Sequence, residues 1–189
     1  MLKIALILGS SRRGRMSPRV AKYIQRRLDE SGKAKTELLD LFEYNFPVME
    51  ERLHKRDDPP SRLKEFSEKI AAADAVVIIS PEYNNGYPAV LKNAIDYLLP
   101  EFKRKPVGIV TVSNGQFGGL NALAQLRMVL ISMGSILVPA RFPVTKVGET
   151  FDENGNPLQP WVEKTANNFL KELFWLSEAV TEKMSRDNL

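Results

Sequence analysis

Small, polar and basic residues concentrate in three segments, residues 9–16, 81–87 and 113–118, each between an apolar run and a helical pattern. These segments contain neither histidine nor cysteine, two side chains that commonly act as base or nucleophile. They offer hydroxyls, guanidinium groups, amides and exposed backbone, which are groups that bind a ligand. We therefore expect a binding site whose ligand supplies the reactivity.

The first segment, residues 9–16, leads into a helical pattern that begins at Ser17-Pro18. Serine accepts hydrogen bonds from the first free N–H groups of a helix and proline suits the first helical position, so we expect Ser17 to cap this helix. A helix N-terminus also presents free N–H groups and a positive dipole end to a phosphate. The side chains that could join them are Ser10, Ser11, Ser17, Arg12, Arg13 and Arg15. A solvated basic loop is the alternative, and the clustering of donors at a helix start favours the phosphate site.

Two common nucleotide motifs are not completed in this segment. Gly9 and Gly14 have the spacing of a P-loop, but Arg15 and Met16 stand where that motif needs a lysine and a Mg²⁺-binding hydroxyl. The dinucleotide fingerprint G-x-G-x-x-G is absent. The segment therefore favours neither an NTPase nor a tightly held dinucleotide.

The second and third segments are suited to a planar ring. Residues 81–87 offer two tyrosines, two asparagines and a glycine, so aromatic faces could cover a ring while backbone groups bind its edge. Residues 113–119 contain three glycines, which let backbone approach a ligand closely. Each segment taken alone is equally compatible with a simple turn, and the combination carries the argument.

The elements that must position these segments alternate between strand and helix. Apolar runs predict five strands, at residues 3–8, 36–41, 74–80, 106–112 and 135–139. Helical spacing predicts helices at residues 17–31, 61–73, 88–99, 119–133 and 161–181. The alternation predicts an α/β fold of one domain, residues 1–189, in which a doubly wound five-stranded parallel sheet has helices on both faces. Ligands of such sheets bind beyond the carboxyl ends of the strands, where all three segments lie.

Together the segments describe a site for a mononucleotide that carries a planar ring, and FMN in a flavodoxin-like fold fits best. The sequence also resembles the NADPH-dependent FMN reductase family of flavodoxin-like quinone, azo and chromate reductases. The resemblance rests on Gly9-Ser10-Ser11-Arg12 with Ser17, on residues 81–96, and on the glycine-rich residues 113–119. It extends over about residues 2–139.

The resemblance implies a cofactor site. The predicted cofactor-binding residues are Ser10, Arg12, Arg15, Met16, Ser17, Pro81, Glu82, Tyr83, Asn84, Gly86, Ser113 and Gly115. Ser10, Arg12 and Ser17 would hold the FMN phosphate, residues 81–84 and 86 would line the isoalloxazine ring, and residues 113 and 115 would approach it from the other side. Many relatives have serine and asparagine where this chain has Arg15 and Ser17, and Arg15 is a candidate contact for the 2′-phosphate of NADPH.

The resemblance also implies a reaction and an assembly. Hydride would pass from NADPH or NADH to flavin N5 and then to a quinone or similar small-molecule acceptor, with azo, nitro, chromate and free flavin acceptors open. No catalytic side chain and no metal are required, because the flavin carries the chemistry. A homodimer or homotetramer is expected, with residues 88–99 and 140–160 as candidate interfaces.

Composition narrows the remaining possibilities. The chain has no cysteine, which excludes disulfides and thiolate chemistry and fits a cytoplasmic location. Its net charge of +4 is weak evidence for nucleic-acid binding, and we interpret the basic residues 103–105 as a solvated turn. No apolar stretch has the length of a signal-peptide core or a membrane span, so no membrane insertion is expected.

Two isolated features receive structural interpretations. The lone histidine, His54, lies among charged residues and is expected to be exposed rather than catalytic. Asp152, Asn154, Asn156 and Glu163 have the spacing of a calcium loop, but Pro157 occupies the position that needs glycine, so a polar turn is expected.

Two other functions remain open. A flavodoxin-type electron carrier would bind FMN and would require a separate reductase, and such carriers use acidic docking surfaces that a net basic chain does not suggest. A regulatory flavin-binding module would bind FMN without turnover.

Overall fold

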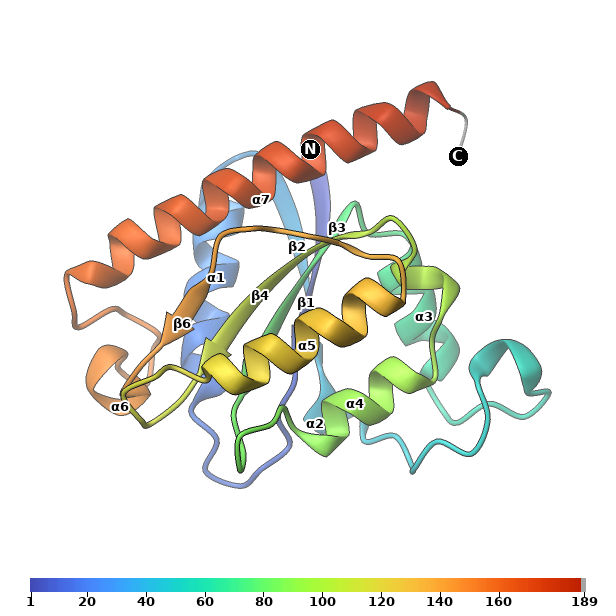
Figure 1. The fold of residues 1–189 in the computed structure, drawn as a ribbon, viewed down its shortest axis with the longest axis horizontal. Coiled ribbons are helices and arrows are strands. Elements are labelled where there is room, and N and C mark those ends of the chain that lie inside the picture. Colours follow the sequence, from blue (N-terminus) through green and yellow to red (C-terminus); the bar gives the residue numbers. More distant parts are fainter. Residues whose placement is uncertain (188–189) are drawn as a thin grey trace.

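The computed structural model describes residues 1–187, whose elements follow one another as strand and helix (Figure 1). The strands are β1 (Leu2–Leu8), β2 (Ala34–Asp40), β3 (Ala75–Pro81), β4 (Pro106–Val112), β5 (Ile136–Leu137) and β6 (Phe142–Val144). The α-helices are α1 (Ser17–Glu30), α2 (Leu41–Tyr44), α3 (Leu63–Ala71), α4 (Ala89–Asp96), α5 (Leu120–Ser132), α6 (Val147–Thr150) and α7 (Trp161–Arg186). Two short 3₁₀ helices, η1 (Leu53–Lys55) and η2 (Pro100–Phe102), complete the list for these residues.

The sheet has the strand order β2-β1-β3-β4-β5, with every pairing parallel. This is the flavodoxin-like order, and it confirms the predicted doubly wound fold. The chain first winds outward from β1 to β2 and then crosses back to β3. The loop after β1 therefore leads to a helix on one face of the sheet, and the loop after β3 leads to a helix on the other face. A crevice forms between these two loops at the carboxyl end of the strands.

The two faces of the sheet carry separate cores, because β1, β3 and β4 are apolar on both sides. Residues of α1 and α7 cover one face, with Ile24 and Phe169 completely buried. Residues of α3, α4 and α5 cover the other face, with Ile70 and Leu126 completely buried. The strands predicted from continuous apolar runs thus pack against helices on both faces of the sheet.

A sixth strand, β6, was not predicted. β5 pairs with only two residues at the beginning of β4, and the chain then returns so that β6 pairs with the carboxyl half of the same strand, with Phe142 opposite Val110. A three-residue strand with a proline in the middle carries no detectable periodicity, and the proline lacks the N–H of an ordinary strand residue. Residues 140–160, for which the sequence predicts neither strand nor helix, therefore contain both β6 and α6.

Residues 152–156, whose spacing resembles that of a calcium loop, form the expected polar turn, and this turn is bonded to α1. The carboxylate of Asp152 accepts hydrogen bonds from the backbone N–H groups of Asn156 and Asn154, and chiefly the bonds from Asn156 keep the pKa of Asp152 below its usual value. Arg19 and Arg26, on one side of α1, donate to the carbonyl oxygens of residues 151 and 155. The segment is thereby held against the helix whose N-terminus faces the predicted site.

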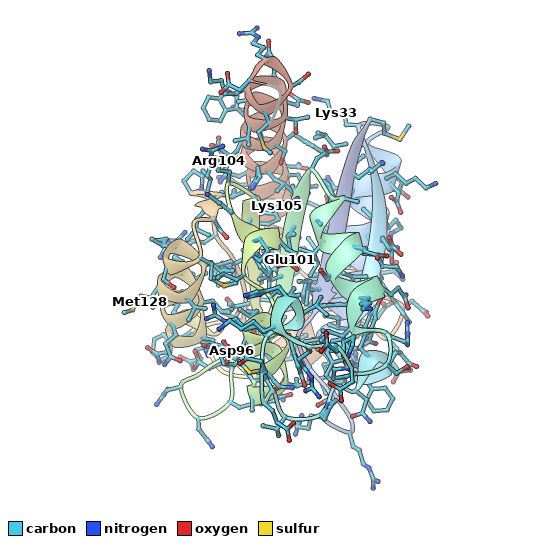
Figure 2. The ribbon with its side chains drawn as sticks, turned by 90° about the vertical axis from the view of Figure 1, so that its right-hand side faces the viewer. Lys33, Asp96, Glu101, Arg104, Lys105 and Met128 are labelled. Carbon is cyan, nitrogen blue, oxygen red and sulfur yellow. The ribbon has the colours of Figure 1, made fainter. Side chains whose placement is uncertain are left out.

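The basic turn at residues 103–105 lies at the opposite end of the sheet from the three segments. Figure 2 shows Arg104 and Lys105 there. Lys105 is not simply solvated, because its amine donates to the carbonyl oxygens of Ala71, at 2.9 Å, and of Ala73, at the end of α3. Burial lowers its pKa. Lys105 therefore caps the C-terminal end of α3.

The lone histidine, His54, lies in η1 and is exposed as expected.

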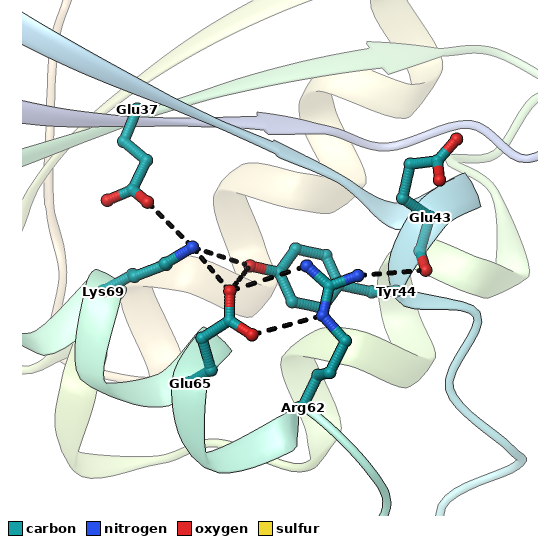
Figure 3. A network of polar contacts seen from close by, with 6 residues as sticks. All are labelled: Glu37, Glu43, Tyr44, Arg62, Glu65 and Lys69. Atoms are coloured by element: carbon teal, nitrogen blue, oxygen red, sulfur yellow. Dashed lines mark hydrogen bonds and ion pairs between the residues drawn. The ribbon is translucent and has the colours of Figure 1, made fainter.

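An ion-pair network joins α3 to β2 and α2 (Figure 3). The Lys69 amine lies 2.8 Å from a carboxylate oxygen of Glu37 and 2.6 Å from one of Glu65. Glu65 also accepts from Arg62, at 3.2 Å, and the guanidinium of Arg62 stacks on the ring of Tyr44. These contacts fasten the strand edge to the helix that covers it.

Replacing Glu65 by glutamine is expected to lower the melting temperature at pH 7 by no more than a few degrees, since the pairs are exposed. Hydrogen bonds from Arg62 and then Lys69 lower the pKa of Glu65 from 4.5 to about 2. The stabilisation is therefore complete above pH 4.5 and is lost as the pH falls toward 2. Melting curves of both proteins from pH 7 to pH 2 should converge at the acid end, and a constant difference would contradict this assignment.

Candidate functional site

The carboxyl ends of β1, β3 and β4 bring the three predicted segments to one cleft of ≈ 270 Å³. It is lined by Ser10, Arg12, Arg15, Met16, Ser17, Pro81, Glu82, Tyr83, Val112, Ser113, Asn114, Gly115 and Val147. Of the predicted cofactor-binding residues, only Asn84 and Gly86 lie outside this lining. A larger groove of ≈ 680 Å³ lies between β2 and α3, but it contains none of the three segments.

The first segment forms the phosphate-type end of the cleft. Ser10 is completely buried, and the backbone N–H groups of residues 11–14 have no backbone acceptor within residues 1–187. They directly precede α1, so free donors lie close to the positive dipole end of that helix.

Ser17 does not cap α1, so that prediction was wrong. Met16 occupies the cap position, Ser17 is the first helical residue, and no side chain bonds to the helix end. With the serine already inside the helix, its hydroxyl cannot reach back to the free N–H groups as a capping residue would.

The Ser17 hydroxyl provides a test of whether the site fits FMN. It is one of three buried side-chain polar atoms without a hydrogen-bond partner among the described residues, and the only one of the three whose residue lines the cleft. An unpartnered buried hydroxyl costs free energy unless a ligand satisfies it. A phosphate oxygen at the start of α1 would satisfy it, so the residues fit the group.

The second segment is a tight turn held by α5. Tyr83 and Gly86 exchange two backbone hydrogen bonds, of 2.8 and 3.0 Å, across Asn84 and Asn85, which both have positive φ. Asparagine tolerates this conformation better than most residues. Asn84 and Gly86 therefore build the turn, and their neighbours Glu82 and Tyr83 reach the cleft.

Helix α5 fixes the orientation of this turn. The Glu82 carboxylate accepts the backbone N–H of Ala122 in the first turn of α5, at 2.9 Å. The amide of Gln125 donates to the carbonyl of Asn85, also at 2.9 Å. The ring end of the cleft is thus built on a helix rather than on a free loop.

The third segment is closed by elements that the sequence did not reveal. The N–H of Ser113 donates to Val144 of β6, and the N–H of Val147 in α6 donates back to Ser113. Val147 and Val112 consequently line the cleft, although nothing in their sequence context marked them. Asn114 lies within the predicted segment and could have been chosen with its neighbours.

A direct contact joins the first and second segments. The hydroxyls of Ser10 and Tyr83 are 2.8 Å apart, and the Arg12 guanidinium lies 5.9 Å from the centre of the Tyr83 ring. Arg15 behaves differently from Arg12, because it forms an ion pair with Asp40 at the end of β2. The predicted phosphate and ring regions are therefore adjacent and linked.

A doubly wound sheet with a phosphate-type loop at its crevice defines a flavodoxin-like nucleotide-binding protein. The family described as NADPH-dependent FMN reductase matches residues 2–149, and the chain belongs to this family. This confirms the resemblance found in the sequence.

Individual relatives agree with the family. The chain is 34% identical over 142 residues to the NAD(P)H-dependent FMN reductase LOT6 of Saccharomyces cerevisiae, covering 68% of this chain and 73% of that protein. It is 31% identical over 179 residues to a quinone reductase of Pseudomonas putida, covering 87% and 92%. The structure of the flavoenzyme NAD(P)H:acceptor oxidoreductase FerB from Paracoccus denitrificans superposes with a TM-score of 0.78 at 25% identity, covering 94% and 98%.

Proposed function

We propose that this chain is an FMN-dependent NAD(P)H oxidoreductase that passes two electrons to a quinone or a similar small-molecule acceptor. The observation that carries the proposal is the unpartnered Ser17 hydroxyl in a cleft at the N-terminus of α1. The membership of a family of flavin reductases supplies the reaction.

The residues divide the work between the two ends of the cleft. Ser10, Arg12 and Ser17 would bind the phosphate with the free backbone N–H groups before α1. Tyr83 and Gly115, from the loops that follow β3 and β4, would confine the ring and hold it in one orientation. Bound FMN supplies the reversible two-electron chemistry, and the protein supplies orientation and electrostatics.

The electron donor is proposed to be NADPH, following the description of the family. Arg15 was the candidate contact for the 2′-phosphate, but Asp40 already balances its charge. Arg13 is exposed in the same loop and is better placed to meet a second anionic group.

Purified protein is expected to be yellow, to release FMN on heating, and to oxidise NADPH in the presence of a quinone without any added reductase. The measurements are the absorption spectrum, identification of the released flavin, and NADPH and NADH turnover against a panel of acceptors. Binding without turnover would indicate a regulatory module, and turnover only with a separate reductase would indicate a carrier. Colourless protein that takes up no added FMN would contradict the proposal.

Assembly and location are further parts of the proposal. No helix of residues 1–187 has the length and apolar character needed to cross a bilayer. We propose one domain, a cytoplasmic location, supported by the lack of cysteine, and a homodimer or homotetramer. Residues 88–99 and 140–160 stay the proposed interfaces. Met128 and Ile131 on α5, 74% and 62% exposed, are two further apolar side chains that could take part, and Figure 2 shows Met128 pointing outward. Equilibrium sedimentation would measure the assembly.

A further inference from the structure

The side chain of Arg15 makes an unusually complete set of contacts for a residue at the rim of a binding cleft. Its two terminal nitrogens lie 2.6 Å from the two carboxylate oxygens of Asp40. The same guanidinium donates to the backbone carbonyl of Ser10 and lies 4.9 Å from the centre of the Phe42 ring. The Arg15 and Asp40 side chains are only 15% and 18% exposed.

These contacts leave little of the guanidinium for a ligand. A bidentate pair uses the forked edge of arginine and neutralises its charge, and one flat face is occupied by the Phe42 ring. An arginine that binds phosphate needs that edge and that charge. Arg15 therefore differs from its neighbours Arg12 and Arg13, which are exposed.

Asp40 is itself held in place. It occupies the cap position of α2, where its carboxylate accepts the backbone N–H of Phe42 at 3.0 Å. It also ends β2, which pairs with β1 along its length, with Leu8 opposite Asp40. The anchor is thus a rigid corner of the sheet rather than a mobile side chain.

The contact to Ser10 connects this anchor to the loop. Ser10 lies two residues beyond β1, and the loop then continues to the N-terminus of α1, with the N–H groups of residues 11–14 bonded to no backbone acceptor among the described residues. Pulling the Ser10 carbonyl toward Arg15 fixes the peptide plane that follows, and hence the direction of the next N–H group. The ion pair thereby determines the course of the loop.

We propose that Arg15 and Asp40 are positioning residues for the phosphate-binding loop, and that Arg15 is not a phosphate ligand. The pair holds the loop in the conformation that presents its N–H groups and the hydroxyls of Ser10 and Ser17 to a phosphate. This inference rests on the proposed function, because it assumes that the cleft binds FMN.

The two roles of Arg15 make opposite predictions for Asp40→Asn. Asparagine retains the capping ability toward α2 but removes the charge that holds Arg15. A positioning role predicts that FMN affinity falls about tenfold or more, the loss typical when a group that orients a binding residue is removed. A ligand role predicts unchanged or tighter binding, since the substitution would release a cation beside the phosphate.

The experiment compares FMN with riboflavin, which lacks the phosphate. Each flavin is titrated into protein freed of cofactor, and dissociation constants are obtained from quenching of flavin fluorescence. For Asp40→Asn we expect the FMN affinity to fall while the riboflavin affinity stays within about twofold, because only the phosphate end is disturbed. Arg15→Lys keeps the charge but not the forked geometry, and should show the same selective loss.

Controls separate the inference from the proposed function. Glu163→Gln breaks the pair between Arg27 and Glu163, away from the cleft, and should leave both affinities unchanged. Wild-type protein that binds FMN no better than riboflavin would overturn the phosphate site itself. If wild type prefers FMN and Asp40→Asn retains that preference, the positioning role is overturned; an equal loss for both flavins would overturn it too, by indicating a general structural defect.

Discussion

Replacing Ser17 by alanine is expected to stabilise the protein without FMN and to weaken its binding of FMN. The two effects have opposite signs because the hydroxyl has no partner within the described protein and lies where a phosphate would bind. An ordinary structural serine would give the reverse stability change. The substitution therefore tests the site through folding as well as through binding.

The magnitudes follow from the cost of burying an unpartnered hydroxyl. Ser17 is 2% exposed, so its removal should raise the free energy of unfolding by about 1 kcal/mol, at the lower end of the penalty for an unsatisfied polar group. A hydrogen bond to a charged group contributes about 1.5–3 kcal/mol, so the FMN affinity should fall by about tenfold to a hundredfold. Riboflavin affinity should change little.

Urea denaturation of cofactor-free protein and flavin titration measure the two effects. Ser177→Ala is the matched control, because Ser177 is also completely buried in a helix but its hydroxyl donates to the carbonyl of Leu173 at 2.7 Å. That variant should not gain stability and should bind FMN as wild type does. A Ser17→Ala protein that is less stable, with FMN affinity intact, would show that the hydroxyl serves the fold and not a phosphate.

The central part of the fold was predictable because β1, β3 and β4 are apolar on both faces. Short continuous apolar runs that alternate with helical patterns are typical of parallel strands buried on both faces. The position of the cleft followed, since the carboxyl ends of parallel strands meet at one edge. Ser10, Tyr83 and Ser113 could be chosen from the sequence for this reason.

What could not be predicted depends on contacts between distant residues. Arg15 was grouped with Arg12 by spacing, but its partner Asp40 lies 25 positions away and is reached only when β1 and β2 pair. Ser17 was predicted to cap α1 because of its residue type, but Met16 occupies the cap position and Ser17 is the first residue of the helix. Val147 begins α6, which follows β6, and it lines the cleft because β6 pairs with β4. The sequence of β6 carries no strand signal.

Replacing Gly155 by alanine is expected to cost about 3 kcal/mol of folding stability, combining left-handed backbone with a steric clash. Gly155 has a φ of +78°, and a Cβ there would lie 2.5 Å from the backbone carbonyl oxygen of Arg19 in α1. Backbone oxygen cannot move aside as the end of a flexible side chain can. Either the turn must lift from α1 or the first part of the helix must shift.

The consequence reaches the cleft through α1. The carbonyl of Gly155 accepts from Arg26 at 2.9 Å, and that of Phe151 accepts from Arg19 at 3.0 Å, so the turn and the helix are held at several points. Residues 147–151 continue from the wall of the cleft into this turn. Displacing the turn should therefore also weaken FMN binding, by less than the loss in Ser17→Ala because no phosphate contact is removed.

Gly32→Ala provides the matched control for Gly155→Ala. Gly32 has a similar φ of +67°, but a Cβ there would meet nothing within 4 Å. It should cost only the conformational penalty of about 1 kcal/mol, with no change in FMN affinity. The difference between the two variants in urea denaturation isolates the contact between the turn and α1. If both lose the same stability, residues 152–157 do not press against the helix, and the close approach of Gly155 to Arg19 has no energetic role.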